Sequence, residues 1–194
     1  MFNQSGKFVV IYGVNGIGKT TQAKLLADYF NRSRQKAKYL KYPVYDVNPS
    51  GLVLNDYLRR GNKFKLSPRE AQVIFTLNRT QFEPQLKEML KQGVNIIAED
   101  YTQTGIAWGI TNGIKQEFLE MINSHLIKEN LSILLDGTPF VESLNPSHLY
   151  EKNYQLIKKA REVFLQLAHQ KKWPIISANQ SINEVHQQIV SLLI

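Results

Sequence analysis

Residues 13–20 carry the strongest chemical signal in the sequence. Gly13 is followed by four residues and then by Gly18, Lys19 and Thr20, which is the phosphate-loop pattern, placed between an apolar run and a helical pattern as it requires. The glycines allow backbone N–H groups to point at a phosphate, the Lys19 ammonium reaches the β- and γ-phosphates, and the Thr20 hydroxyl is a Mg²⁺ ligand. The residues predicted to bind a nucleoside triphosphate are Gly13, Asn15, Gly16, Ile17, Gly18, Lys19, Thr20 and Thr21. The alternative is a glycine turn followed by a solvated lysine.

Two adjacent carboxylates, Glu99 and Asp100, follow the apolar residues 96–98. Charge is costly to bury unless it is paired or bound to a metal. Parallel strands of one sheet end on the same edge, so the end of this strand is expected close to the loop that contains Thr20. Glu99 is therefore predicted to hold Mg²⁺ beside Thr20, directly or through water. The alternatives are a solvated strand end or an intramolecular ion pair, and the residues alone give no role for Asp100.

Short apolar segments alternate along the chain with segments whose apolar residues recur at helical spacing. The segments predicted as strands are residues 7–14, 37–43, 94–100, 131–137 and 174–178. The segments predicted as helical are residues 19–33, 49–61, 68–92, a region through 116–130, 149–170 and 181–193. Capping boxes begin two of these helices, at Ser67 with Glu70 and at Ser181 with Glu184. Strands separated by long helices indicate an α/β protein of one domain, residues 1–194, with a five-stranded parallel sheet and helices on both faces.

Composition excludes several classes of protein. The chain of 194 residues contains no cysteine, so no disulfide framework or thiolate metal site is possible. No apolar stretch approaches the roughly 18 to 20 residues of a membrane span, and the first residues do not resemble a secretory signal. A cytoplasmic protein with no membrane partner is expected. The four histidines have no metal-like spacing and are predicted to be structural.

The net charge of +8 admits two interpretations. Basic proteins often bind polyanions, but the lysines and arginines are spread along this chain without aromatic interleaving or a nucleic-acid motif. A nucleic acid is therefore not the expected partner. Small phosphorylated ligands would use the same positive field.

Beyond the phosphate loop, the chain resembles the thymidylate kinase family, P-loop enzymes that move a phosphoryl group from ATP to dTMP. The segments that carry the resemblance are residues 42–61, 66–79, 101–109, 150–168 and 177–189, and together they follow the family's order over nearly the whole chain. The second of them ends in Asn-Arg, as the family's substrate helix does. The resemblance implies a three-layer P-loop kinase fold, ATP and Mg²⁺ as cofactors, nucleotide substrates, a lid around residues 137–150 and a homodimer.

The resemblance also implies roles for individual residues. Phe75 would stack on thymine and Arg79 would hold the acceptor's phosphate; the two lie four residues apart, hence on one helical face. The catalytic residues would be Lys19, Glu99 and Arg79. The other residues implied in substrate binding are Asn15, Asp100, Tyr101, Thr104 and Trp108, and those implied beside adenine are Ala178, Asn179 and Gln180. Taken alone, Phe75 would be expected in the core, Trp108 could equally be a core residue, and residues 178–180 could be only a turn.

The chain departs from the family pattern where the family carries positive charge. Asp100 stands in place of the arginine of the family's Asp-Arg-Tyr, and Val44 and Tyr45 occupy the region where the family has another arginine. Residues 137–150 contain no arginine or lysine, although family members without a basic phosphate loop supply one from the lid. A missing arginine can slow phosphoryl transfer by several orders of magnitude. The residues that could substitute are Lys41, Arg59, Arg60, Lys152 and Arg161.

A further departure concerns a polar group. Asn15 replaces the aspartate with which the family reaches the sugar hydroxyl, and it can hydrogen-bond but carries no charge. For the reversed charge at Asp100, one hypothesis is that it offsets a nearby cation such as Arg79, or that it joins Glu99 on the metal.

The sequence and the resemblance together predict ATP-dependent phosphorylation of dTMP to dTDP. The acceptor's phosphate oxygen would attack the γ-phosphorus of ATP in line, with no strong general base because this nucleophile is already anionic. The absent arginines leave two alternatives open. One is a kinase for another deoxynucleoside or nucleoside monophosphate, and the other is a nucleotide-binding protein with reduced transfer activity.

Overall fold

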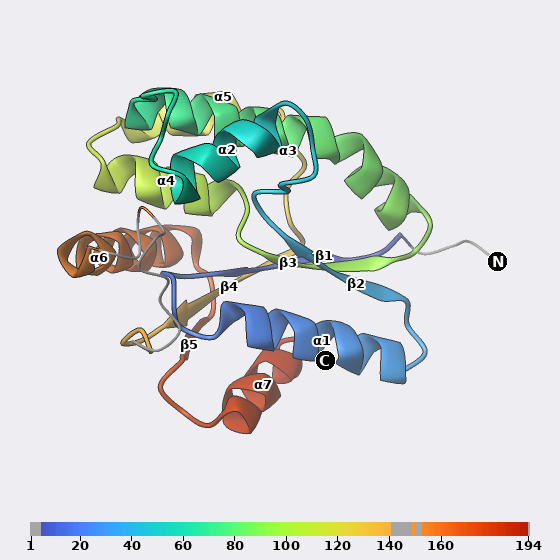
Figure 1. Cartoon of the computed structure of the whole chain (residues 1–194). Coiled ribbons are helices and arrows are strands. Elements are labelled where there is room, and N and C mark those ends of the chain that lie inside the picture. The colour runs from blue at the N-terminus through green and yellow to red at the C-terminus, as the bar shows by residue number, and fades with distance from the viewer. Residues whose placement is uncertain (1–4, 141–148, 150–152, 194) are drawn as a thin grey trace.

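A parallel β-sheet forms the middle layer of the molecule (Figure 1). The computed structural model describes residues 5–140, 149 and 153–193. Its strands are β1 (Phe8–Tyr12), β2 (Ala37–Lys41), β3 (Asn95–Glu99), β4 (Leu131–Asp136) and β5 (Ile175–Ser177), which pair in the order β2-β3-β1-β4-β5. Every pairing is parallel. The predicted α/β class with a five-stranded parallel sheet is confirmed.

Helices cover both faces of this sheet (Figure 1). On one face α1 (Lys19–Arg32) packs with α7 (Ile182–Ser191). The helices on the other side are α2 (Ser50–Arg59), α3 (Pro68–Lys91), α4 (Thr102–Thr111), α5 (Gln116–Asn123) and α6 (Tyr154–Lys171). The result is the predicted three-layer arrangement. No helix in the described ranges is both long and apolar enough to cross a membrane.

The long helix α3 begins where the sequence predicted. The Ser67 side chain accepts from the backbone N–H of Glu70, the Glu70 carboxylate accepts from the backbone N–H of Ser67 at 2.8 Å, and Pro68 occupies the first helical position. This capping box satisfies two backbone donors that an uncapped helix leaves free. It fixes the start of the helix that carries Phe75 and Arg79.

Two predicted helices are shorter than expected. The helical prediction for residues 116–130 is wrong beyond Asn123, where α5 ends. The prediction for residues 149–170 starts too early, because α6 begins at Tyr154, after the Asn153 side chain accepts from the backbone N–H of Leu156. The predicted lid falls mostly on residues 141–148 and 150, which lie outside the described residues, as does Lys152.

The register of the sheet decides which residues meet at its carboxyl edge. Ile11 of β1 pairs with Glu99 of β3, and Glu99 pairs on its other side with Lys41 of β2. The loop that follows β1 therefore lies beside the acid that ends β3. This is the neighbourhood predicted from the rule that parallel strands end on one edge.

Candidate active site

The loop of residues 13–18 turns sharply between β1 and α1. Gly13 has φ +139° and Gly18 has φ +86°, conformations that favour glycine. A Cβ on Gly13 would lie 2.4 Å from the carbonyl oxygen of Leu135, so a side chain cannot be placed there. Because α1 starts at Lys19, the loop presents the positive end of the helix together with backbone N–H groups. This is an anion-binding arrangement.

Lys19 is buried at the mouth of this loop, with only 4% of its surface exposed. Its Nζ donates to the carbonyl oxygens of Gly13 at 2.9 Å and Val14 at 2.8 Å, and it lies 3.7 Å from Asp100 Oδ1. An ammonium carries three donors, so Lys19 can donate to a phosphate while it keeps at least one of its two contacts with the loop carbonyls. The loop holds the charge where a triphosphate would lie.

Glu99 is the centre of a polar cluster beside the loop. Its Oε2 accepts from the hydroxyls of Thr20 and Tyr39, both at 2.7 Å, and its Oε1 accepts from Lys41 Nζ at 2.8 Å. Burial disfavours the ionised form, but the charges of Lys19 and Lys41 and these hydrogen bonds outweigh it and hold the pKa of Glu99 below its ordinary value. The structure thus brings together Thr20 and an ionised Glu99, as predicted.

A hydroxyl and one carboxylate suit Mg²⁺, which favours oxygen ligands and is commonly held by one or two carboxylates together with phosphate oxygens. The described residues contain no group of three or more acidic, histidine or cysteine ligands that would form an all-protein metal cage. Thr20 and Glu99 therefore fit a magnesium ion that arrives with a nucleotide.

Asp100 lies next to Glu99 but in a different environment. Its φ of +64° places it in the left-handed region, which Asp adopts more readily than most residues. Its carboxylate accepts from the Thr104 hydroxyl at 2.9 Å and forms its ion pair with Lys19. Burial raises the pKa of Asp100, opposed by Lys19 and reinforced by Glu99. Asp100 therefore faces a nearby cation, as hypothesised, but among the described residues its ion-pair partner is Lys19 and not Arg79.

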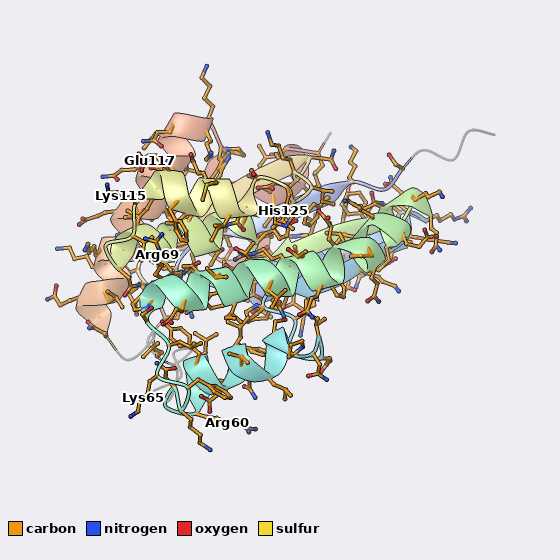
Figure 2. All side chains as sticks on the ribbon, turned by 90° about the horizontal axis from the view of Figure 1, so that it is seen from above. Arg60, Lys65, Arg69, Lys115, Glu117 and His125 are labelled. Atoms are coloured by element: carbon orange, nitrogen blue, oxygen red, sulfur yellow. The ribbon has the colours of Figure 1, made fainter. Side chains whose placement is uncertain are left out.

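A cavity of about 260 Å³ opens over the loop. Two of the proposed substitute cations line it, Lys41 at the end of β2 and Arg59 at the end of α2. The Arg59 guanidinium lies over the Tyr45 ring, 4.7 Å from its centroid. Arg60 and Arg161 do not line this cavity, and Arg161 is held by both oxygens of Asp136 at 2.6 and 2.8 Å. Arg60 projects from the outer surface of the α2 end (Figure 2).

A second, smaller cavity of about 40 Å³ lies beside the first and shares several of its lining residues. Phe75, Thr104 and Trp108 line both cavities, and Tyr101 lines the second, as expected for a nucleoside pocket. Arg79, which is 4% exposed, lines the second cavity but not the first. No residue of the phosphate loop lines the second cavity. The structure therefore brings Arg79 together with Phe75, but away from the loop.

Arg79 is held in place by polar contacts within the helical layer. Its Nη1 donates to Asn123 Oδ1 at 3.0 Å, whereas its Nε is buried without a partner among the described residues. Burial lowers the pKa of Arg79, although an arginine remains charged in a protein. Gln72, 2% exposed and on the same helix, also lines this cavity. The sequence analysis missed it, although its spacing from Phe75 and Arg79 is helical.

A third cavity of about 430 Å³ lies on the other side of the loop. Ala178 and Gln180 line it together with Gly18 and Thr21 of the phosphate loop. Asn179 does not line it; its amide accepts from the backbone N–H of Thr138 at 2.7 Å and donates to the Thr138 carbonyl at 3.0 Å. Two of the three residues predicted beside adenine thus border a space next to the loop, and the third braces the turn that presents them.

The fold and this site define a class of protein. A parallel sheet whose first strand leads into a phosphate loop, with a carboxylate at the end of the neighbouring strand beside the loop threonine, is the architecture of the P-loop phosphotransferases.

Comparison with known proteins narrows this class. The family model described as "Thymidylate kinase" matches residues 11–189. The chain is 30% identical to the probable thymidylate kinase of Thermococcus kodakarensis over 96% of each chain, and 28% identical to the thymidylate kinase of Plasmodium falciparum over 96% of this chain and 89% of that one. The solved structure of thymidylate kinase from Candida albicans superposes with a TM-score of 0.80 at 25% identity, over 97% of this chain and 91% of that one. The chain belongs to the thymidylate kinase family.

Proposed function

We propose that this protein transfers the γ-phosphoryl group of ATP to dTMP, giving dTDP and ADP, with Mg²⁺ as the metal. The observation that carries the proposal is that the cavity over the phosphate loop and the cavity of Phe75 and Arg79 share several of their lining residues. A triphosphate site and a nucleoside site would therefore lie side by side. Family membership supports this acceptor over the alternatives.

The donor would bind along the loop. Backbone N–H groups of residues 13–20 and Lys19 would hold the phosphates, and adenine would lie against Ala178 and Gln180. Thr20 and Glu99 would hold the metal, which would neutralise charge on the β- and γ-phosphates. Asp100, 3.7 Å from Lys19, would keep the ammonium turned toward the transferred group.

The acceptor would lie with its base in the smaller cavity. Phe75 would stack on the thymine ring, with Trp108 and Tyr101 closing the pocket around it. Because Arg79 lines this cavity and not the one over the loop, we assign it to the base, where it would donate to a carbonyl oxygen of thymine. This replaces the expected role of Arg79 at the acceptor's phosphate.

The acceptor's phosphate would then lie in the larger cavity. Among the described residues, Lys41 and Arg59 are the cations that line it besides Lys19, and we assign the phosphate to them. Asn15 lines the same cavity and would hydrogen-bond the sugar hydroxyl. The anionic phosphate oxygen needs no base, so these residues act by holding it in line with the γ-phosphorus and by excluding water.

A coupled assay of ADP release tests the function. The purified protein, ATP and Mg²⁺ would be mixed with dTMP, dUMP, dCMP, dGMP or thymidine, one at a time. ADP release that requires an acceptor and is fastest with dTMP is expected. Release at the same rate without an acceptor, or binding of ATP with no release under any condition, would contradict the proposal and favour a nucleotide-binding protein without transfer.

Replacing Arg59 with glutamine is expected to raise the Kd for dTMP by about 10- to 100-fold, because a charge-assisted contact with the phosphate is lost. Affinity for thymidine, which has no phosphate, should not change. Arg60→Gln is the matched control, since Arg60 is the adjacent arginine and projects from the surface (Figure 2). Isothermal titration with dTMP and thymidine measures both. An equal loss in both arginine variants would show a general charge effect instead.

Replacing Gly105 with alanine is expected to weaken dTMP binding by about tenfold while the protein stays folded. The new Cβ would lie 2.8 Å from Arg79 Nη2 and 2.9 Å from Gln72 Oε1, so the ends of both side chains would have to move. The control is Gln103→Ala on the same helix α4, at a residue that lines neither the cavity over the loop nor the smaller one. Unchanged dTMP affinity in Gly105→Ala would contradict the base-binding role of Arg79.

We also propose, from the family resemblance, that the protein is a cytoplasmic homodimer. The helices α2 and α3 pack together and leave Leu52, Val73 and Leu77 exposed, apolar side chains that a second copy could cover. Light scattering after gel filtration would show a mass near twice 22.3 kDa. A monomer at working concentration would refute the dimer.

A further inference from the structure

Gln72 is a buried polar residue that the phosphate chemistry does not use. It lies on α3 with 2% of its surface exposed, three residues before Phe75 and seven before Arg79, so the three share one face of the helix. Its side-chain Oε1 is buried and has no hydrogen-bond partner among the described residues. A buried oxygen without a donor is destabilising and uncommon in native proteins. Such an atom in the wall of a cavity points to a ligand that donates to it.

Gln72 Oε1 and the Arg79 guanidinium face the same small space. A Cβ built on Gly105 would lie 2.9 Å from Gln72 Oε1 and 2.8 Å from Arg79 Nη2, so both atoms reach one point over Gly105. All three residues line the smaller cavity, and Phe75 forms another of its walls. The cavity thus presents a hydrogen-bond acceptor beside a donor, in the reach of an aromatic ring.

We infer that Gln72 is a specificity-determining residue, which accepts a hydrogen bond from the N3–H group of the acceptor's thymine base. The inference rests on the proposed function, since it concerns the base of the same acceptor. Thymine presents a carbonyl oxygen at C4 next to the N3–H donor, which complements the donor of Arg79 and the acceptor of Gln72. Cytosine presents an amino donor at C4 and an acceptor at N3.

A cytosine base in the same place would oppose donor to donor and acceptor to acceptor. Sites built to hydrogen-bond one pattern reject the mismatched one strongly, because buried polar groups of the site are left unpaired. Uracil has the same N3–H and C4 carbonyl edge as thymine and differs only in the methyl group. The inferred contact therefore separates thymine and uracil together from cytosine.

The test replaces Gln72 with methionine, which keeps the length of the side chain but is only a weak acceptor. The ratio kcat/KM would be measured for dTMP, dUMP and dCMP. A fall of about 10- to 100-fold is expected for dTMP and dUMP alike, with a change of less than about threefold for dCMP. The melting temperature of the ligand-free variant should not fall, because an unpaired buried oxygen has been removed; a purely structural role for Gln72 requires that it does.

Gln81→Met is the matched control. Gln81 lies on the same helix and its Oε1 is likewise buried without a described partner, but it lines none of the cavities around the loop. Gln81→Met should leave the kcat/KM values for dTMP, dUMP and dCMP unchanged relative to one another. Equal losses for all three bases in Gln72→Met, or the same shift in Gln81→Met, would overturn the inference.

Two outcomes separate this inference from the function on which it rests. If the wild-type protein phosphorylates none of the monophosphates, the proposed function fails. If it phosphorylates dTMP and Gln72→Met does not fold, binding of N3-methyl-dTMP to the wild-type protein decides the matter. N3-methyl-dTMP is expected to bind at least about tenfold more weakly than dTMP, which is the effect of losing about one hydrogen bond. Equal binding of the two would overturn the role of Gln72.

Discussion

Replacing Lys19 with methionine is expected to lower kcat for ADP formation by about 10³-fold. The ammonium is 4% exposed and held by the loop carbonyls of Gly13 and Val14, so its charge is fixed where the transferred phosphoryl group gains charge in the transition state. Methionine keeps an unbranched side chain of similar length, so the packing around α1 is largely preserved. A steady-state coupled assay with dTMP measures the change.

The control for this variant is Lys24→Met on the same helix. Lys24 lies over the Tyr39 ring at 5.6 Å from its centroid and does not line the cavity over the loop, so its kcat should stay within about twofold of the wild-type value. Circular dichroism would confirm that both variants are folded. If Lys19→Met retained more than about a tenth of the wild-type kcat, the loop would not be the catalytic phosphate site.

Local signals in the sequence were sufficient for most of the fold. The capping box at Ser67 and the glycine loop before Lys19 both mark helix starts that the structure confirms, because each involves contacts between residues close in the chain. The end of α5, which the sequence placed too late, depended on tertiary packing. Leu126 and Ile127 continue an apolar pattern after α5, but they pack against the core without being helical.

The proximity of Thr20 and Glu99, the pair proposed to hold the metal, could be predicted because a motif and a topological rule meet there. The phosphate-loop pattern named Thr20, and parallel strand order brought Glu99 to it, at 2.7 Å in the structure. The position of Arg79 could not be predicted in the same way. Which cavity it lines depends on how α3 crosses the sheet, and helical spacing only placed it on the face of Phe75.

The substitute cations illustrate the same limit. The sequence offered Lys41, Arg59 and Arg161 with equal claim, since charge alone does not tell where a side chain lies. In the structure Arg161 is bound by Asp136, whereas Lys41 and Arg59 line the cavity over the loop. Only the packing of α2 against α3 and the register of β2 with β3 make that distinction.

Replacing Glu99 with glutamine is expected to lower kcat by about 10²- to 10³-fold and to remove most of the Mg²⁺ dependence of ATP binding. The amide keeps the shape of the carboxylate but loses its charge. In one orientation its NH₂ group would face the Lys41 ammonium, and in the other it would face the hydroxyls of Thr20 and Tyr39, so a donor would meet a donor in both. Titration of ATP affinity against Mg²⁺ concentration, together with kcat, measures the effect.

The same substitution makes a prediction for stability with a definite sign. Because the pKa of Glu99 is lowered in the folded protein, its ionised form stabilises the fold above the pKa of the unfolded chain, and this stabilisation is lost as pH falls through the lowered value. Glu99→Gln lacks it at every pH. The difference in melting temperature between wild type and variant should therefore be largest near neutral pH and shrink in acid.

Glu129→Gln is the matched control for both effects. Glu129 also accepts from a tyrosine hydroxyl, that of Tyr12 at 2.6 Å, but it does not line the cavity over the loop. It should leave the Mg²⁺ dependence of ATP binding unchanged. Glu99→Gln could instead lose stability but keep its Mg²⁺ dependence and its kcat. The carboxylate would then only stabilise the sheet edge, as the partner of Lys41. The metal would have to be held by Thr20 and the phosphates.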